Sequence, residues 1–320
     1  MCRPFSLCCL FLLALSPVVA QTRLACWNVE NLFDTCDDVL TRDDAFTPRG
    51  ENHWTWRRFV GKRDKIYKTL AAMGYPVAVG LVEVENDWVL DELCLGTPLR
   101  RLQYGYVHYD SPDPRGIDCA LLFRRDRFRL LEQRPLGMSD SAAGYFTRDI
   151  LLVGGRLPQG DTLYLLVNHW PSKLGGSQAD SHRSRIALRL CSVMDSLHRV
   201  HPESWVVAMG DFNATPQEVQ TMLQPCSGEA GLHNLMENLP DSCASYKYQG
   251  HWQFIDQILV CTPVSRRRPR VDAGVFMATW LLTDDSRYMG VKPFRTYQAM
   301  VYQGGVSDHL PVYLDFLCDE

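Results

Sequence analysis

Eight short apolar runs set the strongest limit on how this chain can fold. Each is rich in valine, leucine, isoleucine and aromatic residues, and polar residues, glycine or proline bound it. This length and composition are typical of buried strands. The runs are Leu24–Trp27, Pro76–Val84, Cys119–Phe123, Ile150–Val153, Leu163–Val167, Trp205–Met209, Phe254–Val260 and Leu310–Phe316.

Two longer segments place apolar residues every three or four positions, which predicts helices with one apolar stripe. The first stripe is Trp56, Phe59, Arg63, Ile66, Leu70 and Met73, and the second is Ile186, Leu190, Val193 and Leu197. Many strands with few helices indicate an α/β protein in which two packed sheets are flanked by helices. The chain shows no repeat, low-complexity tract or linker, so we expect one domain over residues 21–320.

Residues 1–20 have the layout of a secretory signal peptide. Arg3 gives a positive start, residues 7–15 are apolar, Pro17 follows, and residues 18–20 are small enough for a cleavage site. The alternative is a membrane anchor, but the apolar run is well short of the ~20 residues that span a bilayer. We therefore expect export to the periplasm or the cell exterior.

The net charge and the cysteine content limit which functional classes and metal sites we expect for this chain. The net charge of −4 argues against a chromatin-type binder, although local basic groups around an acidic metal site remain compatible with a nuclease. Nine cysteines follow residue 20, without a C-x-x-C spacing, so a structural zinc site is not expected. Cys26, Cys119 and Cys261 lie in apolar runs and should be buried, and we expect a disulfide between Cys226 and Cys243.

Polar groups stand where several of these strands end. Asn28, Glu83, Asn168-His169 and Asp211 each follow an apolar run, and Asp256 lies inside one. A carboxylate within an apolar strand is costly unless it is paired or bound to a metal. One cavity at the strand ends, in which a cation and a histidine neutralise the carboxylates, accounts for all of these positions.

Five segments in this order resemble the motif set of the endonuclease/exonuclease/phosphatase superfamily, the DNase I-like fold. They are Trp27–Asp34, Glu83–Asn86, Asn168–Lys173, Gly210–Pro216 and Ser307–Pro311. The resemblance covers residues 23–316, and its opening motif resembles exported bacterial members. It implies a four-layer α/β sandwich, with two packed mixed β-sheets flanked by helices, and metal-dependent hydrolysis of phosphate esters by a single catalytic domain.

The resemblance also implies a metal site. Glu83 would be the main ligand of Mg²⁺, Asn28 would position the metal and the phosphate, and Asp308 would be a second carboxylate on the metal side. Mg²⁺ takes oxygen ligands and keeps several waters, so one or two carboxylates suffice. Mn²⁺ is the expected substitute.

The remaining site residues would act on the phosphate and the attacking water. Asp211, held by Asn213, would orient or deprotonate the water, and Asp256 would orient His309 and favour its protonated form. His169 would donate a hydrogen bond to a phosphate oxygen. Which of Asp211 and His309 is the general base stays open.

Arg115 resembles a phosphate-contacting position of the family, although a salt-bridged loop arginine is an equal alternative. Three functions share this catalytic core: a nuclease, a phosphatase or phospholipase-like esterase, and an inactive binding module. We favour a monomeric endonuclease acting on nucleic acid. The run Arg266–Arg270 could follow a nucleic-acid backbone, and Trp170 could stack on a base.

Overall fold

The computed structural model describes residues 22–224, 232–263, 265 and 271–316. The predicted signal peptide and the Arg266–Arg270 run lie outside the described residues. Among the described residues, no helix has the length and apolar character needed to cross a membrane.

Two six-stranded mixed sheets form the centre of the molecule, which confirms the predicted architecture. The first sheet has the order β13 (Val271–Val275), β18 (Val312–Phe316), β1 (Thr22–Leu32), β2 (Ala78–Val84), β4 (Asp118–Arg124) and β3 (Tyr104–His108). The second has the order β5 (Arg129–Leu136), β6 (Ile150–Arg156), β7 (Thr162–His169), β8 (Trp205–Asp211), β12 (Asp256–Cys261) and β9 (Leu232–Asn234).

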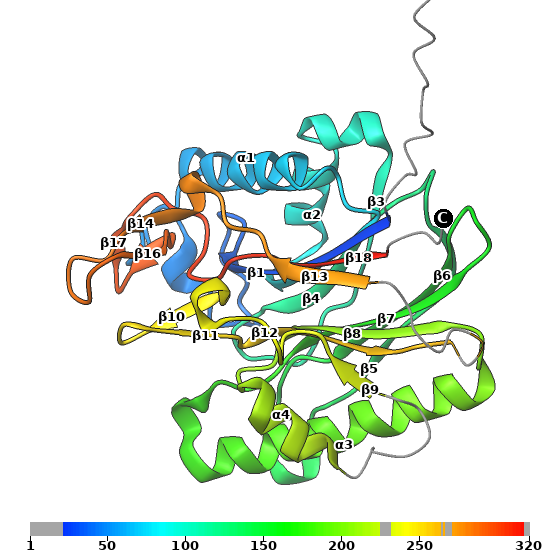
Figure 1. Cartoon of the computed structure of the whole chain (residues 1–320). Helices are drawn as coiled ribbons and strands as arrows, with labels where there is room; N and C mark the ends of the chain where they lie inside the picture. Colours follow the sequence, from blue (N-terminus) through cyan, green and yellow to red (C-terminus); the bar gives the residue numbers. More distant parts are fainter. Residues whose placement is uncertain (1–21, 225–231, 264, 266–270, 317–320) are drawn as a thin grey trace, which may run out of the picture.

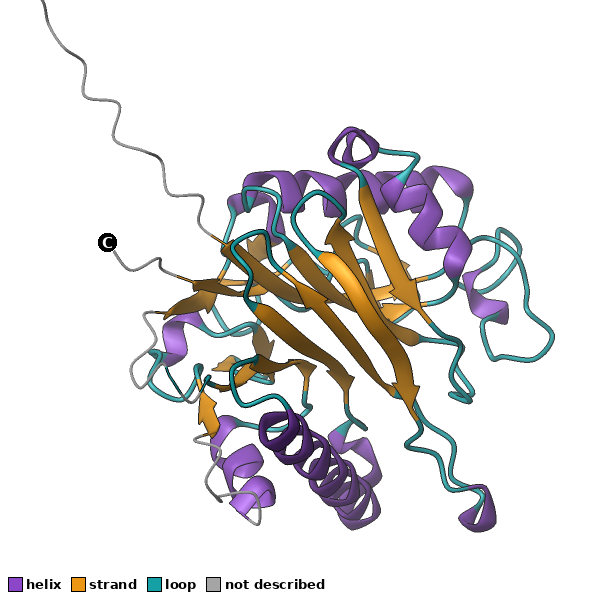
Figure 2. Ribbon diagram, turned by 90° about the vertical axis from the view of Figure 1, so that its right-hand side faces the viewer, coloured by secondary structure: helices purple, strands orange, loops and turns teal. Residues whose placement is uncertain are grey.

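Helices cover the outer faces of both sheets, giving four layers (Figures 1 and 2). Helices α1 (Trp56–Ala72) and α2 (Asp87–Cys94) lie over the first sheet. Helices α3 (Gly176–Val200) and α4 (Pro216–Leu223) lie over the second. Helix α1 agrees with the predicted stripe, whereas α3 begins ten residues before Ile186.

Short elements make up the rest of the described chain. Three two-stranded hairpins pair β10 (Tyr246–Tyr248) with β11 (His251–Gln253), β14 (Leu282–Asp284) with β15 (Val291–Pro293), and β16 (Tyr297–Gln298) with β17 (Val301–Tyr302). The 3-10 helices are Asp44–Phe46, Pro98–Leu102, Ser141–Ala143, Lys173–Gly175, Asp241–Cys243 and Thr279–Leu281.

The alternation of side chains along the central strands explains the layers. In β1, Leu24 and Cys26 pack between the sheets, while Ala25 and Trp27 pack against α1 and α2. In β8, Val207 and Met209 lie between the sheets, and Val206 and Ala208 face α3. Strands that are apolar on both faces are buried on both faces, which is why they appear in the sequence as continuous apolar runs.

The structure confirms the predicted burial of three cysteines but not the predicted disulfide. Cys26, Cys119 and Cys261 are buried, as expected. Cys243 carries a free, exposed thiol, so the predicted Cys226–Cys243 disulfide is wrong, and Cys226 lies outside the described residues. Cys191 on α3 is the described cysteine that forms a disulfide. A pairing rests on three-dimensional proximity, which the spacing of cysteines along the chain does not give.

Candidate active site

The ends of two pairs of parallel strands meet at one edge of the sandwich. Strands β1 and β2 are parallel in the first sheet, and β7 and β8 are parallel in the second. Their carboxyl ends carry Asn28, Glu83, His169 and Asp211. Residues separated by up to 183 positions in the sequence therefore lie at one site, and Asn28 contacts Asp211 directly.

The backbone is irregular where these side chains enter the site. Glu83 and Asn213 have φ angles of 64° and 47°, in the left-handed region that non-glycine residues rarely adopt. The pairing register of β2 shifts between Val82 and Val84, around Glu83. Strain of this kind persists only where the surrounding structure fixes it, and it gathers at functional sites.

Asn28 joins the two carboxylates at the centre of the site. Its Nδ2 donates to Asp211 Oδ2 at 3.0 Å and lies 3.4 Å from Glu83 Oε1. Its Oδ1 accepts from the backbone N–H of Glu30 at 2.9 Å. Asn28 thus holds Glu83 and Asp211 side by side through its amide nitrogen, while its oxygen is turned toward the backbone.

Asp256 and His309 form a buried pair beside Asp211. Asp256 Oδ2 lies 2.8 Å from His309 Nδ1 and also accepts from Ser245 Oγ at 2.6 Å. Burial lowers the pKa of His309, but Asp256 and Asp211 outweigh it and raise that pKa well above its usual value. His309 Nε2 faces Asp211 Oδ2 at 3.8 Å. Burial raises the pKa of Asp211 to about 7, although His309 opposes this rise.

The segment that carries His309 is fixed to β1. Trp27 Nε1 donates to the His309 carbonyl at 2.9 Å, and Ser307 Oγ donates to the Asn28 carbonyl at 2.6 Å. Ser307 Oγ in turn accepts from the His309 N–H at 3.0 Å. The Ser307-Asp308-His309 motif therefore uses its serine and backbone to dock His309 against the site.

The pKa of His169 is shifted in the opposite direction from that of His309. Burial, followed by Arg148 and Arg115, lowers its pKa well below the usual value, so it is neutral. Arg148 donates to His169 Nε2 at 3.0 Å and to Asp113 Oδ2 at 2.8 Å. A neutral His169 that accepts from Arg148 at Nε2 carries its proton on Nδ1. Arg148 therefore occupies the Nε2 side of His169, next to the position predicted for contact with a phosphate oxygen, and both side chains line the cavity.

Three further predicted residues border the site. Asn213 donates its side-chain amide to the Trp170 carbonyl at 2.9 Å, and its backbone N–H donates to Asp211 Oδ1 at 2.8 Å. Arg115 donates to Asn31 Oδ1 at 2.6 Å and lies 3.7 Å from Glu83 Oε2. Asp308 is paired with Arg295 at 2.9 Å.

These side chains surround a cavity of about 590 Å³. One part of its lining is cationic and comprises Arg115, Arg148 and Lys173. Another part is aromatic and comprises Tyr246 and Tyr248 of the β10–β11 hairpin. Glu83, His169, Asp211, Asn213 and His309 also line the cavity, whereas Asp256 lies behind His309. A phosphate can therefore meet cations, carboxylates and a charged histidine in one recess.

Trp170 does not take part in this cavity. Its side chain is fully buried, with Nε1 donating to Asn168 Oδ1 at 3.1 Å and its ring packed on Phe212. The predicted stacking of Trp170 on a base is therefore wrong. A tryptophan that follows a candidate site histidine in the sequence can suggest a role in binding, but the Trp170 side chain belongs to the hydrophobic core.

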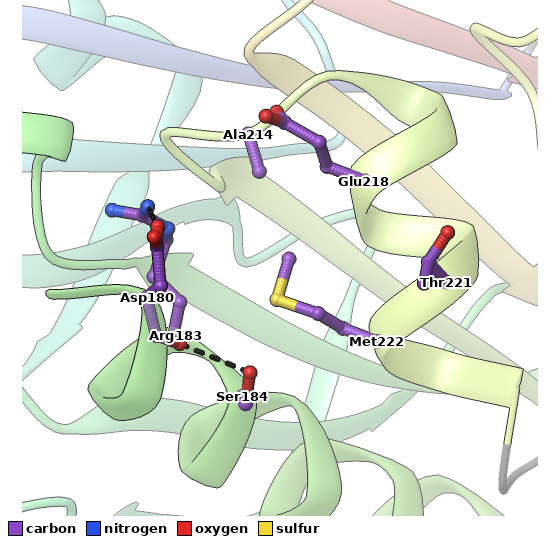
Figure 3. Close-up of a pocket in the computed structure, with 7 residues that line it drawn as sticks. All are labelled: Asp180, Arg183, Ser184, Ala214, Glu218, Thr221 and Met222. Atoms are coloured by element: carbon purple, nitrogen blue, oxygen red, sulfur yellow. Dashed lines mark hydrogen bonds and ion pairs between the residues drawn. The ribbon is translucent and has the colours of Figure 1, made fainter. Parts of the chain in front are cut away.

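A second hollow of about 300 Å³ lies between α3 and α4 (Figure 3). Its charged groups already have partners within the protein. Arg183 pairs with Asp180 and donates to the Pro171 carbonyl, and Glu218 pairs with Lys173. Asp180 also accepts from Ser184 Oγ through its backbone carbonyl. This hollow offers no unpaired charge to a substrate.

The oxygen donors of the cavity fit a hard divalent cation. Glu83 presents its carboxylate at a side-chain exposure of 13%, and Asp211 lies beside it through Asn28. Asp211, Asp256 and His309 also have ligand atoms within 4.8 Å of one another. That second group is better described as an ion pair beside a carboxylate, because His309 is protonated and bonded to Asp256. Glu83 and Asp211 are the oxygens that suit Mg²⁺ or Mn²⁺.

Several site residues escaped the sequence analysis. Arg148 is a charged residue just before the apolar run of β6. Its position could have been noticed in the same way as the carboxylates that stand beside other runs. Lys173 stands inside a recognised motif, yet only the fold shows that it lines the cavity. Tyr246 and Tyr248 lie in a short polar segment that carries no periodic signal.

Comparison with known proteins identifies the family of this chain and solved structures that share its fold. The model of the Endonuclease/Exonuclease/phosphatase family matches residues 23–317. A search of curated proteins found no match.

Solved structures share the fold at low sequence identity. Danio rerio TDP2 complexed with single strand DNA product is 16% identical, with a TM-score of 0.59, and the match covers 93% of this chain and 100% of that one. The human Nocturnin catalytic domain with bound sulfate is 17% identical, with a TM-score of 0.57 and 93% of each chain covered. The Bacteroides thetaiotaomicron mannosyl-6-phosphatase is 15% identical, with a TM-score of 0.58 and coverage of 93% and 100%.

Proposed function

The chain belongs to the endonuclease/exonuclease/phosphatase family of phosphoesterases, and we propose that it hydrolyses phosphate esters with a divalent cation bound at Glu83, beside Asp211. The observation that carries this proposal is the pair formed by Asp211 and His309. Their facing atoms are 3.8 Å apart, and their surroundings raise the pKa of both groups, that of Asp211 to about 7 and that of His309 well above its usual value. A carboxylate poised near neutral pH can serve as a base beside an imidazolium that serves as a donor.

The chemistry of each group follows from its place in the cavity. A bound cation would polarise the phosphate and offset its developing charge. Asp211, held by Asn28 and the Asn213 N–H, accepts a proton from the attacking water. His309, held protonated by Asp256, donates to a phosphate oxygen. Arg148 and Arg115 bind the remaining phosphate charge.

We propose a nucleic-acid strand, cut internally, as the substrate. Cations on one part of the cavity can hold phosphates, while Tyr246 and Tyr248 can stack on a base or sugar. The similarity to TDP2 bound to a single strand DNA product supports this choice. Trp170 does not support it, because its side chain is buried, and Arg266–Arg270 lies outside the described residues.

A compact phosphomonoester is the second candidate, and the recess favours it. Arg148 and His169 have side-chain exposures of 10% and 2%, so a phosphate must enter the cavity to reach them. A terminal phosphate on a small molecule does this readily. The similarity to a mannosyl-6-phosphatase is compatible with this alternative.

One panel of assays separates the candidates. Purified residues 21–320 are incubated with plasmid, RNA, single-stranded DNA and phosphomonoesters, with Mg²⁺, with Mn²⁺ and with chelator. Internal cleavage of nucleic acid supports the nuclease, whereas release of inorganic phosphate with nucleic acid left intact supports the phosphatase. Glu83→Gln should abolish either activity, and Glu132→Gln, an exposed change on β5, should preserve it. Full activity in chelator or in Glu83→Gln would refute metal dependence.

We also propose that residues 1–20 direct export and that residues 21–320 form the mature monomeric enzyme. The disulfide at Cys191 supports export, because disulfides persist in oxidising compartments. Mass spectrometry of the secreted product should give a mature N-terminus near Gln21.

A further inference from the structure

Asp113 is a buried carboxylate that contacts two of the cationic residues of the cavity. It lies on the loop between β3 and β4, and its side chain is 4% exposed. Its Oδ2 accepts from Arg148 Nη1 at 2.8 Å, and its Oδ1 accepts from the backbone N–H of Arg115 at 2.8 Å. Arg115 and Arg148 line the cavity, whereas Asp113 lies behind them. Asp113 can therefore influence a bound phosphate through these two arginines.

The contact with Arg148 joins the two sheets beside the cavity. Arg148 stands just before β6 of the second sheet, whereas the loop that carries Asp113 belongs to the first. The Arg148 side chain is 10% exposed, and its Nη2 lies 3.0 Å from His169 Nε2 and 3.4 Å from the Trp170 carbonyl oxygen. A buried ion pair that loses one partner leaves an uncompensated charge. The place of the Arg148 guanidinium should therefore depend on Asp113.

The contact with Arg115 fixes the backbone from which that side chain extends. The Asp113 carbonyl also accepts from the Gly116 N–H at 3.0 Å, which closes a turn around Arg115. The guanidinium of Arg115 reaches β1, where its Nη2 donates to Asn31 Oδ1 at 2.6 Å. The Asn31 N–H donates to Glu83 Oε2 at 2.9 Å, and Arg115 Nη2 lies 3.7 Å from the same oxygen. The turn that Asp113 holds thus places Arg115 beside Glu83.

We propose that Asp113 is a positioning residue that holds Arg115 and Arg148 together as one phosphate clamp. One of its oxygens orients a guanidinium from the second sheet, and the other fixes the backbone of an arginine from the first. A clamp that is assembled before its ligand enters loses less conformational freedom on binding than two independent side chains would. The inference rests on the proposed function, in which both arginines bind the charge of the phosphate.

Titration calorimetry of inorganic phosphate into the purified chain of residues 21–320, in saturating Mg²⁺, tests the clamp without a substrate. Asp113→Asn keeps an acceptor for the Arg115 N–H but removes the charge that faces Arg148, so it should raise the phosphate dissociation constant by about tenfold or more. Asp113→Ala loses both contacts and should raise it by about threefold more. The matched control is Asp110→Asn on the same loop, where the side chain is 87% exposed. That variant should stay within about twofold of the wild type.

Two further measurements separate positioning from a loss of folded protein. The KM of Asp113→Asn for a small phosphate ester should rise together with the phosphate dissociation constant. A smaller folded fraction would instead lower the apparent kcat and leave KM unchanged. The Mn²⁺ dissociation constant should change by less than about threefold, because Asp113 does not contact Glu83 or Asp211, whereas Glu83→Gln should raise it by about tenfold or more.

The outcomes distinguish the clamp from the proposed function. Wild-type phosphate affinity in a folded Asp113→Asn, equal losses in Asp113→Asn and Asp113→Ala, or a loss of Mn²⁺ affinity as large as the loss of phosphate affinity would overturn the clamp. A wild-type chain that hydrolyses no phosphate ester with Mg²⁺ or Mn²⁺ would overturn the proposed function, and the phosphate titrations would still test the clamp.

A double variant covers the case in which the single variants do not fold. Asp113→Asn combined with Arg148→Gln removes both buried charges together, so neither is left without a partner. This variant should fold, which thermal unfolding checks, and it should raise the phosphate dissociation constant by about tenfold or more. Phosphate affinity equal to that of the wild type would overturn the clamp.

Discussion

A single carboxylate inside an apolar strand gave the most specific expectation about a contact. Asp256 follows Phe254-Ile255 and precedes Ile258-Leu259-Val260, and burial without a partner would be prohibitive there. The partner is His309, 53 residues later, at 2.8 Å. Arg148 and Arg295 escaped prediction for the converse reason: an arginine in a polar loop costs nothing, so its sequence context does not require a partner.

Asp256 and His309 should act as one unit in catalysis. Asp256→Asn removes the charge that keeps His309 protonated, and His309→Ala removes the donor itself, so each should lower kcat by about 100-fold or more. Steady-state kinetics of the two single variants and the double variant provide the measurement. The double variant should lose little more than the worse single variant, because residues of one unit are non-additive. Losses that multiply would show that the two residues act independently.

At the scale of elements, the strands that could be predicted are those whose sequences are continuous apolar runs. All eight predicted runs lie on or overlap strands of the two sheets, because strands buried between two layers must be apolar on both faces. Strand β5 was missed because most of its side chains are exposed at the sheet edge. Helices α2 and α4 have eight residues each, too few to show a clear helical period. What marks these two helices in the sequence is the residues that cap their N-termini. These are Asn86 before α2 and the Thr215–Glu218 capping box of α4.

Gly210 of β8 allows the strands under the active site to approach closely. A Cβ atom there would lie 1.9 Å from the Asn168 carbonyl oxygen on β7. Gly210→Ala should therefore destabilise the protein by about 3 kcal/mol or more, or prevent folding. Gly61→Ala in α1 is the matched control, since nothing lies within 4 Å of its Cβ position. It should stabilise by about 0.5–1 kcal/mol in chemical denaturation. A Gly210→Ala variant as stable as the wild type would contradict this account of the β7–β8 contact.

The loop that carries Asp113 and Arg115 depends on a buried histidine at its start. His108 Nδ1 lies 3.0 Å from Asp87 Oδ1 and 4.0 Å from Asp110, and its Nε2 lies 3.5 Å from Asp118 Oδ2. Burial lowers the pKa of His108, but Asp118, Asp87 and Asp110 together raise it above the usual value. The imidazolium therefore links α2, the loop and β4.

His108→Gln should destabilise the protein by about 1–3 kcal/mol, because it leaves the buried carboxylate of Asp118 without a charged donor. A raised folded-state pKa means that the contribution of His108 is full below its unfolded pKa of about 6.5 and is lost as the pH rises through the folded value. The difference in unfolding free energy between wild type and variant should thus be larger at pH 6 than at pH 9. Denaturation at both pH values measures it, with the exposed His201→Gln as control. A difference that grows with pH would show the opposite sign of linkage.

At the scale of the whole molecule, the family motifs predicted the catalytic face but not what surrounds it. Strand ends gather at one edge in any fold of this topology, so Asn28, Glu83, His169 and Asp211 could be placed together in advance. The cavity walls come from loops and short hairpins, whose positions follow from packing of distant segments. We expect substrate preference to depend on those walls, and the motifs alone therefore do not distinguish a nuclease from a phosphatase.

The salt dependence of binding addresses that preference for the molecule as a whole. Arg115, Arg148 and Lys173 line the cavity, and Arg266, Arg267, Arg268 and Arg270 are four further cations in the sequence. For a single strand, the slope of log K against log salt is about −0.7 per neutralised phosphate. Three contacts give a slope of about −2, and seven give about −5.

If the four arginines follow the strand, replacing them with glutamine should change the slope from about −5 to about −2 and weaken binding, while cleavage of a small phosphodiester stays unchanged. Fluorescence anisotropy with labelled single-stranded DNA across a salt series measures both quantities. Glutamine at the exposed Arg100, Arg101, Arg127 and Arg129 makes the same change in net charge at the sheet end away from the cavity. That control should leave the slope near −5, because these cations do not contact the strand. Equal slopes for both quadruple variants would remove the arginine run from the binding surface, and a wild-type slope near zero would favour the compact phosphate ester that the recess can enclose.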